Sequence, residues 1–135
     1  MSIVLKCILI VLIGAGGLFS SCSVFPEVVL YNHSGKDLTL RSDSQSYYIA
    51  NGAIISVRDP GLTRIMKLSY EGGEWEYKFA YPPREFFKPK FPAGEEIHFQ
   101  VEPGGLVYVL KPDISMPVQE LPLQPPGFPL TPKGL

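Results

Sequence analysis

The sequence predicts an all-β protein, a small antiparallel two-sheet β-sandwich followed by a proline-rich C-terminal tail. Three observations support this prediction. Short runs of alternating apolar and polar residues recur throughout residues 27–111, and turn motifs rich in glycine, asparagine and proline separate them. The chain of 135 residues also contains 13 glycines and 14 prolines. Such a composition suits short strands joined by tight turns and disfavours long helices.

The first half of this region contains a series of candidate strands, each followed by a turn signal. They are expected at residues 27–32, 36–41, 45–50 and 53–58. In the second of them, Leu38 and Leu40 occupy one face, as in a half-buried strand. Asn51-Gly52, between the third and the fourth, is a strong signal for a two-residue hairpin turn.

The clearest hairpin is expected at residues 64–71 and 74–81, which flank Gly72-Gly73. In the second arm, aromatic residues alternate with charged or small ones. These aromatic residues are Trp75, Tyr77, Phe79 and Tyr81. One apolar face and one charged face are typical of an antiparallel sheet with one side in water.

The last expected strands lie at residues 95–102 and 106–111 and enclose a Pro-Gly-Gly turn. The first alternates, whereas the second is apolar on both faces and is expected to be the most buried, central strand. Together the strands favour an immunoglobulin-like sandwich, with a small barrel as the alternative. The Cys-Trp-Cys signature of antibody domains is absent from the sequence, so this likeness is expected to be architectural only.

The tail, residues 112–135, is expected to be extended and similar to polyproline II because prolines recur along it. Phe128 and Leu130 make it more apolar than a disordered tail would usually be. Two interpretations stay open. The tail either binds an aromatic-lined groove of a partner, or packs along its own domain and covers a sheet edge.

The N-terminal segment, residues 1–21, is expected to be a signal peptide. One basic residue, Lys6, precedes an apolar run at residues 7–19. A membrane-spanning helix needs about 20 apolar residues, so this run is short for a span and suits a signal-peptide core.

The end of this segment, Leu18-Phe19-Ser20-Ser21-Cys22, resembles the lipobox of bacterial lipoproteins. There a large apolar residue and two small residues precede the cysteine that receives lipid. Phe19 departs from the pattern, because Leu is usual at that position. Ordinary signal cleavage nearby and an uncleaved anchor are the alternatives.

The resemblance implies that Cys22 is acylated and becomes the first residue of the mature chain. It also implies that residues 22–26 form a short linker between membrane and domain. Ser23, rather than Asp, after the cysteine implies the periplasmic face of the outer membrane in a Gram-negative host. Acylation would explain why Cys22 remains as a single cysteine once Cys7 has left with the signal peptide.

Charge and motifs argue against several other classes of function. With 12 basic and 13 acidic residues the formal charge is −1, so no nucleic-acid partner is expected. No nucleophile elbow, phosphate loop or zinc-ligand spacing is present in the sequence, and no enzyme activity, catalytic residue, metal or cofactor is expected. The histidines, His33 and His98, are expected to be solvated.

The most unusual internal feature is the segment at residues 82–94, whose prolines exclude a central strand. It interleaves basic and aromatic side chains, which are Arg84, Phe86, Phe87, Lys88, Lys90 and Phe91. In an exposed loop such a mixture suits contact with a membrane surface, an anionic glycan or a partner protein. The alternative is that the phenylalanines plug one end of the sandwich while the charges stay in water.

Taken together, these features predict an outer-membrane lipoprotein that acts as a non-enzymatic binding or assembly module of the cell envelope. Its partners would be the membrane, through Cys22, and an envelope protein. A first alternative is a glycan- or lipid-binding lipoprotein that uses residues 82–94. A second is the anchoring subunit of a secretion complex, by analogy with the small sandwich lipoprotein of type VI systems.

Overall fold

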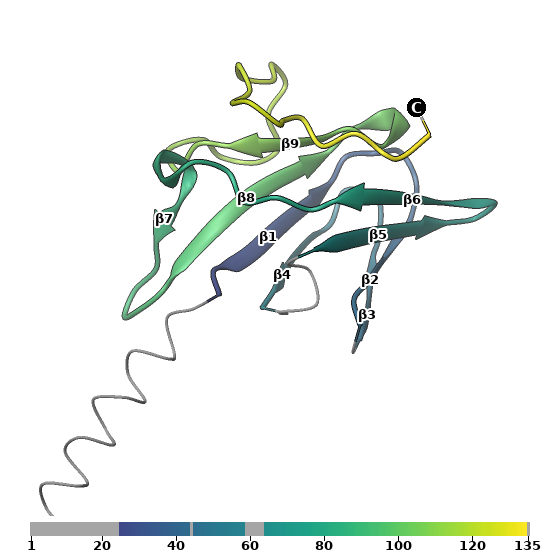
Figure 1. Ribbon diagram of the computed structural model, residues 1–135, viewed down its shortest axis with the longest axis horizontal. Coiled ribbons are helices and arrows are strands. Elements are labelled where there is room, and N and C mark those ends of the chain that lie inside the picture. Colours follow the sequence, from purple (N-terminus) through teal and green to yellow (C-terminus); the bar gives the residue numbers. More distant parts are fainter. Residues whose placement is uncertain (1–24, 44, 59–63, 135) are drawn as a thin grey trace, which may run out of the picture.

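The computed structural model describes residues 25–43, 45–58 and 64–134. Residues 1–21, expected to be a signal peptide, and Cys22 lie outside the described residues. The chain forms two stacked β-sheets, sheet A and sheet B (Figure 1). Sheet A contains β1 (Glu27–Asn32), β4 (Ile54–Val57), β7 (Lys88–Pro89), β8 (Glu95–Val101) and β9 (Val107–Leu110). Sheet B contains β2 (Leu38–Arg41), β3 (Ser46–Ile49), β5 (Ile65–Tyr70) and β6 (Gly73–Lys78).

The predicted all-β sandwich is confirmed, and each expected strand is present. β1 has the expected bounds, and the ends of the other strands differ from those expected by at most three residues. The expected hairpin joins β5 to β6, with Leu68 opposite Trp75, and its turn is Glu71-Gly72 because Gly73 already pairs with Tyr70.

The hairpin expected at Asn51-Gly52 does not form, because β3 and β4 on either side of this turn lie in different sheets. Strand β7 was not predicted. It spans two residues at the sheet edge, where Pro89 can take part without a backbone N–H.

One strand pair departs from the antiparallel arrangement that was expected. β1 pairs with β8 in parallel, with Val28 opposite Ile97 and Leu30 opposite Phe99. A parallel pair needs a long crossover, and here the crossover contains all of sheet B. The strand orders β4-β1-β8-β7 and β3-β2-β5-β6 differ from the ABED and CFG sheets of immunoglobulin domains, so the likeness is one of architecture and not of strand order.

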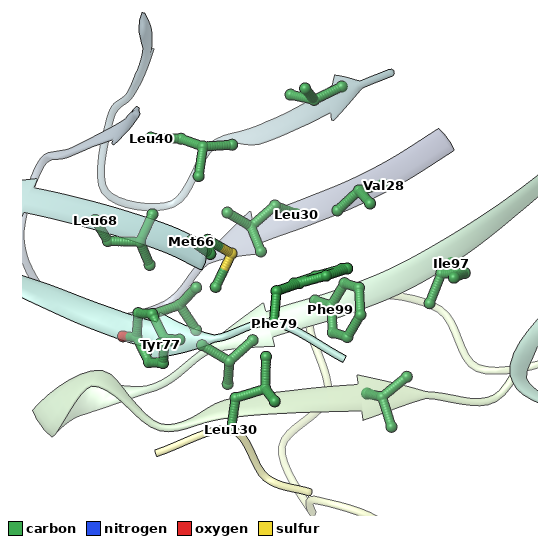
Figure 2. Packing of buried hydrophobic residues seen from close by; sticks show 14 of the residues in the cluster. Val28, Leu30, Leu40, Met66, Leu68, Tyr77, Phe79, Ile97, Phe99 and Leu130 are labelled. Carbon is green, nitrogen blue, oxygen red and sulfur yellow. The ribbon is translucent and has the colours of Figure 1, made fainter. Parts of the chain in front are cut away.

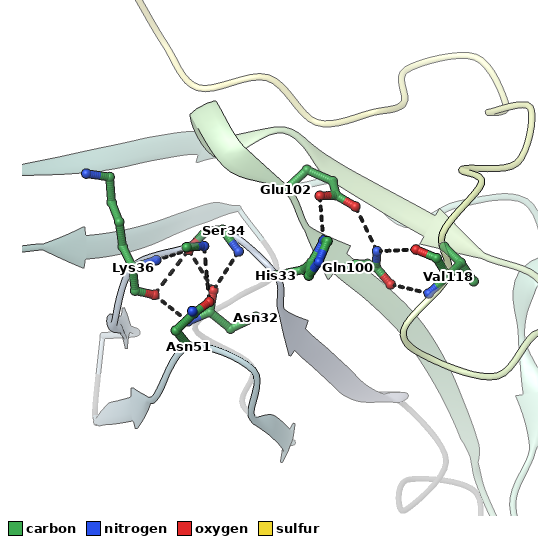
Figure 3. Close-up of polar contacts among 9 residues, drawn as sticks. Asn32, His33, Ser34, Lys36, Asn51, Gln100, Glu102 and Val118 are labelled. Atoms are coloured by element: carbon green, nitrogen blue, oxygen red, sulfur yellow. Dashed lines mark hydrogen bonds and ion pairs between the residues drawn. The ribbon is translucent and has the colours of Figure 1, made fainter.

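The crossover begins at Asn32, whose side chain is fully buried. Its amide nitrogen donates hydrogen bonds to the carbonyls of Lys36 (2.7 Å) and Ile49 (3.0 Å). Its amide oxygen accepts from the backbone N–H of Ser34 at 3.1 Å and from the Ser34 hydroxyl at 2.7 Å. One side chain therefore satisfies the backbone where the chain leaves sheet A for sheet B (Figure 3).

The core lies between the two sheets and receives every second residue of most strands (Figure 2). Sheet A contributes Leu30 and Phe99, and sheet B contributes Leu68 and Tyr77. All four are at most 1% exposed. The Tyr77 hydroxyl donates a 2.6 Å hydrogen bond to the carbonyl of Gly105, which satisfies the polar atom of this buried ring.

The expectation that residues 106–111 form a central strand was wrong. β9 pairs with one strand, β8, and its other edge is covered by the tail. Val107 and Leu130 exchange backbone hydrogen bonds of 3.0 and 2.8 Å. The side-chain amide of Gln124 binds both backbone groups of Val109, at 2.9 and 3.0 Å. The tail therefore supplies the burial that was attributed to a central position.

The tail packs along its own domain and crosses from sheet A to sheet B (Figure 1). Leu130 is 5% exposed and belongs to the core cluster, and the Phe128 ring stacks on Phe99 with centroids 6.2 Å apart. Farther on, the Lys133 N–H donates to the Glu76 carbonyl of β6 at 2.8 Å. Of the two interpretations left open for residues 112–135, packing on the domain describes the tail.

Candidate functional site

The aromatic residues of the segment at residues 82–94 divide into two groups. Phe86 is 3% exposed and belongs to the core. Phe87 packs against the core, and the Arg84 guanidinium lies over its ring at 4.5 Å. Phe91, in contrast to both, does not pack in the core, because its side chain is 95% exposed. Phe86 and Phe87 therefore help to close the sandwich, and Phe91 remains available for contact with another molecule.

The basic residues of this segment are paired with carboxylates of sheet A. Arg84 forms two hydrogen bonds with Glu95, at 2.6 and 2.8 Å. Lys88 lies 3.9 Å from Glu96. Each pair leaves less positive charge for an anionic ligand than the sequence alone suggests, because the carboxylate already balances it.

Lys90 completes this series by binding Glu27 at the start of β1. The Arg58 guanidinium lies 3.6 Å from the same carboxylate. The hydrogen bond from Lys90 is the main cause that holds the pKa of Glu27 below its ordinary value of 4.5, against the opposing effect of burial. The loop after β7 is thus fixed to the N-terminal end of the domain.

The two histidines do not contact each other in their hydrogen bonds, and each is bonded to a different glutamate. His33 Nδ1 is 2.8 Å from Glu102, and His98 Nε2 is 2.8 Å from Glu96. His98 was expected to be solvated, but its side chain is 12% exposed and its Nδ1 is buried without a hydrogen-bond partner. On the same face, Gln100 is fully buried and bonded to Val118 of the tail (Figure 3).

At Gln100, the tail covers a sheet face that alternation alone assigns to solvent. Within residues 25–43, 45–58 and 64–134, no three His, Cys, Asp or Glu side chains are grouped so that they could hold a metal ion.

In the same part of the chain, no helix is long and apolar enough to cross a membrane.

An open hollow of about 530 Å³ lies on sheet B. Its lining comes from strands β2, β3 and β5, from the residues that precede β2 and from the turn after β5. The lining residues are Lys36, Asp37, Thr39, Tyr48, Ser69, Tyr70 and Glu71. The strand register explains this gathering, since Thr39 is opposite both Tyr48 and Ser69. Tyr48 is 66% exposed, so its ring forms an accessible flat surface in the hollow.

Two pairs of side chains in the lining of the hollow contact each other, Tyr48 with Asp37 and Lys36 with Tyr70. The Tyr48 hydroxyl hydrogen-bonds to Asp37, and this bond raises the pKa of the tyrosine. The Asp37 carboxylate also accepts the backbone N–H of Asn51 at 2.9 Å. On the other side, the Lys36 ammonium lies over the Tyr70 ring at 5.0 Å. The hollow thus offers an aromatic surface beside hydroxyls, carboxylates and an ammonium group.

Sequence reasoning missed this hollow, although Tyr47-Tyr48 gave a signal. Adjacent residues of a strand face opposite sides, so one of the two rings had to point outward. Tyr47 packs against the core, and Tyr48 is the outward ring. Comparison with protein families, with curated proteins and with solved structures found no match for this chain.

Proposed function

We propose that this protein is an outer-membrane lipoprotein whose sandwich acts in the periplasm as a non-enzymatic binding or assembly module. The observation that carries the proposal is the lipobox-like sequence that ends at Cys22. The first strand of the domain, β1, begins five residues later, at Glu27. Each buried methylene of an acyl chain contributes about 0.8 kcal/mol, and durable anchoring needs more than one chain. The acyl chains of a mature lipoprotein would meet this need without a membrane-spanning segment.

Fractionation of cells that express the full chain tests the anchor and its destination. Cys22→Ser removes the acylated thiol and is expected to abolish the membrane-bound mature form. Cys7→Ser is the matched control, because it changes the other cysteine of the sequence and leaves the lipobox intact. Equal amounts of the membrane-bound mature form in both variants would contradict the proposal.

The destination is tested by a single change after the lipidated cysteine. Ser23→Asp is expected to move the protein from the outer to the inner membrane when the two are separated on a density gradient. Retention of this variant in the outer membrane would contradict the sorting role of Ser23. It would leave the anchor itself unaffected, because Cys22 is unchanged.

The binding module acts, in this proposal, through the hollow on sheet B, and its ligand is an envelope glycan. The exposed Tyr48 ring favours this ligand class, because sugar rings have an apolar face that packs on aromatic rings and hydroxyls that hydrogen-bond to carboxylates. Asp37, Thr39 and Ser69 supply such partners around the ring. This site replaces residues 82–94 as the candidate glycan site, since the cations of that segment are paired.

Calorimetric titration with an N-acetylglucosamine oligosaccharide tests the hollow. Tyr48→Ala is expected to reduce the affinity at least about tenfold, which corresponds to about 1.4 kcal/mol. Tyr48→Phe is a graded control, because it keeps the ring and removes only the hydroxyl that Asp37 binds. Equal affinities of the wild-type protein and Tyr48→Ala would exclude the hollow as the glycan site.

A further inference from the structure

Two exposed phenylalanines lie at the end of the domain where β1 begins. Phe91 is 95% exposed and Phe25 is 40% exposed. The ion pair between Lys90 and Glu27 brings them to this end, because Phe91 follows Lys90 and Phe25 comes two residues before Glu27. Figure 1 shows the start of β1 and the loop between β7 and β8 at the same end of the molecule.

Basic side chains accompany the two rings. Arg58 and Lys90 both face the one carboxylate of Glu27, and their side chains are 54% and 37% exposed. The Arg58 guanidinium also lies beside Gly94, within the loop that carries Phe91. Because two cations share one carboxylate, this group keeps one positive charge that is not balanced. Exposed rings next to such a charge suit the interface of a phospholipid bilayer, where apolar groups enter the headgroup boundary and cations meet the phosphates.

The length of the linker limits where this end can be. An extended chain advances at most about 3.6 Å per residue, so Glu27 lies within about 18 Å of Cys22. We propose that the bilayer that holds the Cys22 lipid is the ligand of this surface, and that Phe91, assisted by Phe25, inserts into its headgroup layer. The inference rests on the proposed lipid anchor, which makes docking an intramolecular event.

Docking by this end would also orient the hollow on sheet B. β1 runs six residues, about 20 Å, from Glu27 to Asn32. The Asn32 amide binds the carbonyl of Lys36, which lines the hollow. The hollow therefore lies near the opposite end of β1, and a domain that stands on Phe91 presents it away from the membrane.

Site-directed spin labelling of the full chain, processed and inserted into phosphatidylethanolamine–phosphatidylglycerol vesicles, tests the contact. Ala93→Cys places a nitroxide next to Pro92 in the Phe91 loop without altering Phe91. Leu123→Cys is the matched control, since Leu123 is also 95% exposed and adjoins Gln124, which binds β9. The label at 93 is expected to be more accessible to oxygen than to a nickel chelate, and the label at 123 to show the reverse.

The same samples separate failure of the docking from failure of the anchor. Phe91→Ser in the Ala93→Cys background is expected to abolish the preference of the label for oxygen. The docking would be overturned if the label at 93 were as accessible to the nickel chelate in the Ala93→Cys protein as in the variant that also carries Phe91→Ser. Reaction of the unsubstituted mature chain with the spin label would show a free Cys22 thiol, and would overturn the anchor on which the inference rests.

Discussion

The side-chain amide of Gln100 binds both backbone polar groups of Val118. The Val118 N–H donates to Oε1 at 3.0 Å, and Nε2 donates to the Val118 carbonyl at 3.2 Å. Nε2 also donates to the Glu102 carboxylate at 2.8 Å. Gln100 is fully buried, and its side chain satisfies the two backbone groups that a neighbouring strand would otherwise bind. This one side chain of β8 therefore holds the tail on the outer face of sheet A.

Loss of this amide is predicted to destabilise the domain. Gln100→Leu leaves the N–H and the carbonyl of Val118 without their partner, and an unsatisfied buried polar group costs about 1–3 kcal/mol. Equilibrium urea unfolding of residues 23–135 measures the change. Gln119→Leu is the control, because Gln119 is an exposed residue of the same segment. Coincident unfolding curves for the two variants would contradict the role of Gln100.

The distal part of the tail is predicted to contribute to the core. Leu130→Ala removes a side chain that is 5% exposed and lies against β9, and a buried Leu→Ala change costs about 2–5 kcal/mol. Leu123→Ala changes the same residue type in the same tail where it is 95% exposed, and is expected to stay within about 0.5 kcal/mol of the wild-type protein. Thermal unfolding of the two variants makes this comparison, and similar midpoints would mean that Leu130 is not a core residue.

The turn before β9 offers a comparison of neighbouring glycines. Gly104 and Gly105 both have positive φ, so alanine at either position is strained by about 1–2 kcal/mol. A Cβ at Gly105 would also come within 2.7 Å of the Trp75 ring and 2.9 Å of Pro132, whereas nothing lies within 4 Å at Gly104. Gly105→Ala is therefore expected to be clearly the more destabilising variant in urea unfolding, and the reverse order would refute this packing.

The ion pair between Lys90 and Glu27 predicts a specific dependence of stability on pH. The pKa of Glu27 is lower in the folded protein than its ordinary value of 4.5. Such a carboxyl stabilises the fold above the unfolded pKa, and this stabilisation is lost as the pH falls through the folded pKa. Lys90→Met should thus cost up to about 1 kcal/mol at neutral pH and progressively less below pH 4.5.

Urea unfolding across this pH range checks the prediction. Lys78→Met serves as the control because Lys78 is an exposed residue of β6, in the other sheet. Its effect is expected to change little with pH. A cost of Lys90→Met that is constant from neutral pH to acid would contradict the coupling to Glu27.

The strands could be predicted because alternation reports directly on one buried and one wet face. The register between distant strands could not. Residues 106–111 are apolar on both faces, which describes a central strand and equally an edge strand that a later segment covers. The covering residue, Leu130, lies far along the chain from Val107, and no local pattern joins them.

The candidate site could not be predicted either, because it too depends on which distant strands are neighbours. The partners of Arg84, Lys88 and Lys90 are carboxylates at the starts of β1 and β8, which become neighbours through the parallel pairing. Without that pairing, the segment at residues 82–94 resembles a free cationic loop. The hollow likewise needs Thr39 aligned with both Tyr48 and Ser69, an alignment that the separate strands do not encode locally.

The lipid anchor is the central claim, and the mass of the mature protein tests it most directly. Full-length protein is expressed in a Gram-negative host, extracted from membranes and digested, and its N-terminal peptide is measured by mass spectrometry. The account predicts a peptide that begins at Cys22 and carries the mass of added acyl chains. An unmodified Cys22, or a chain that begins at a later residue, would contradict it.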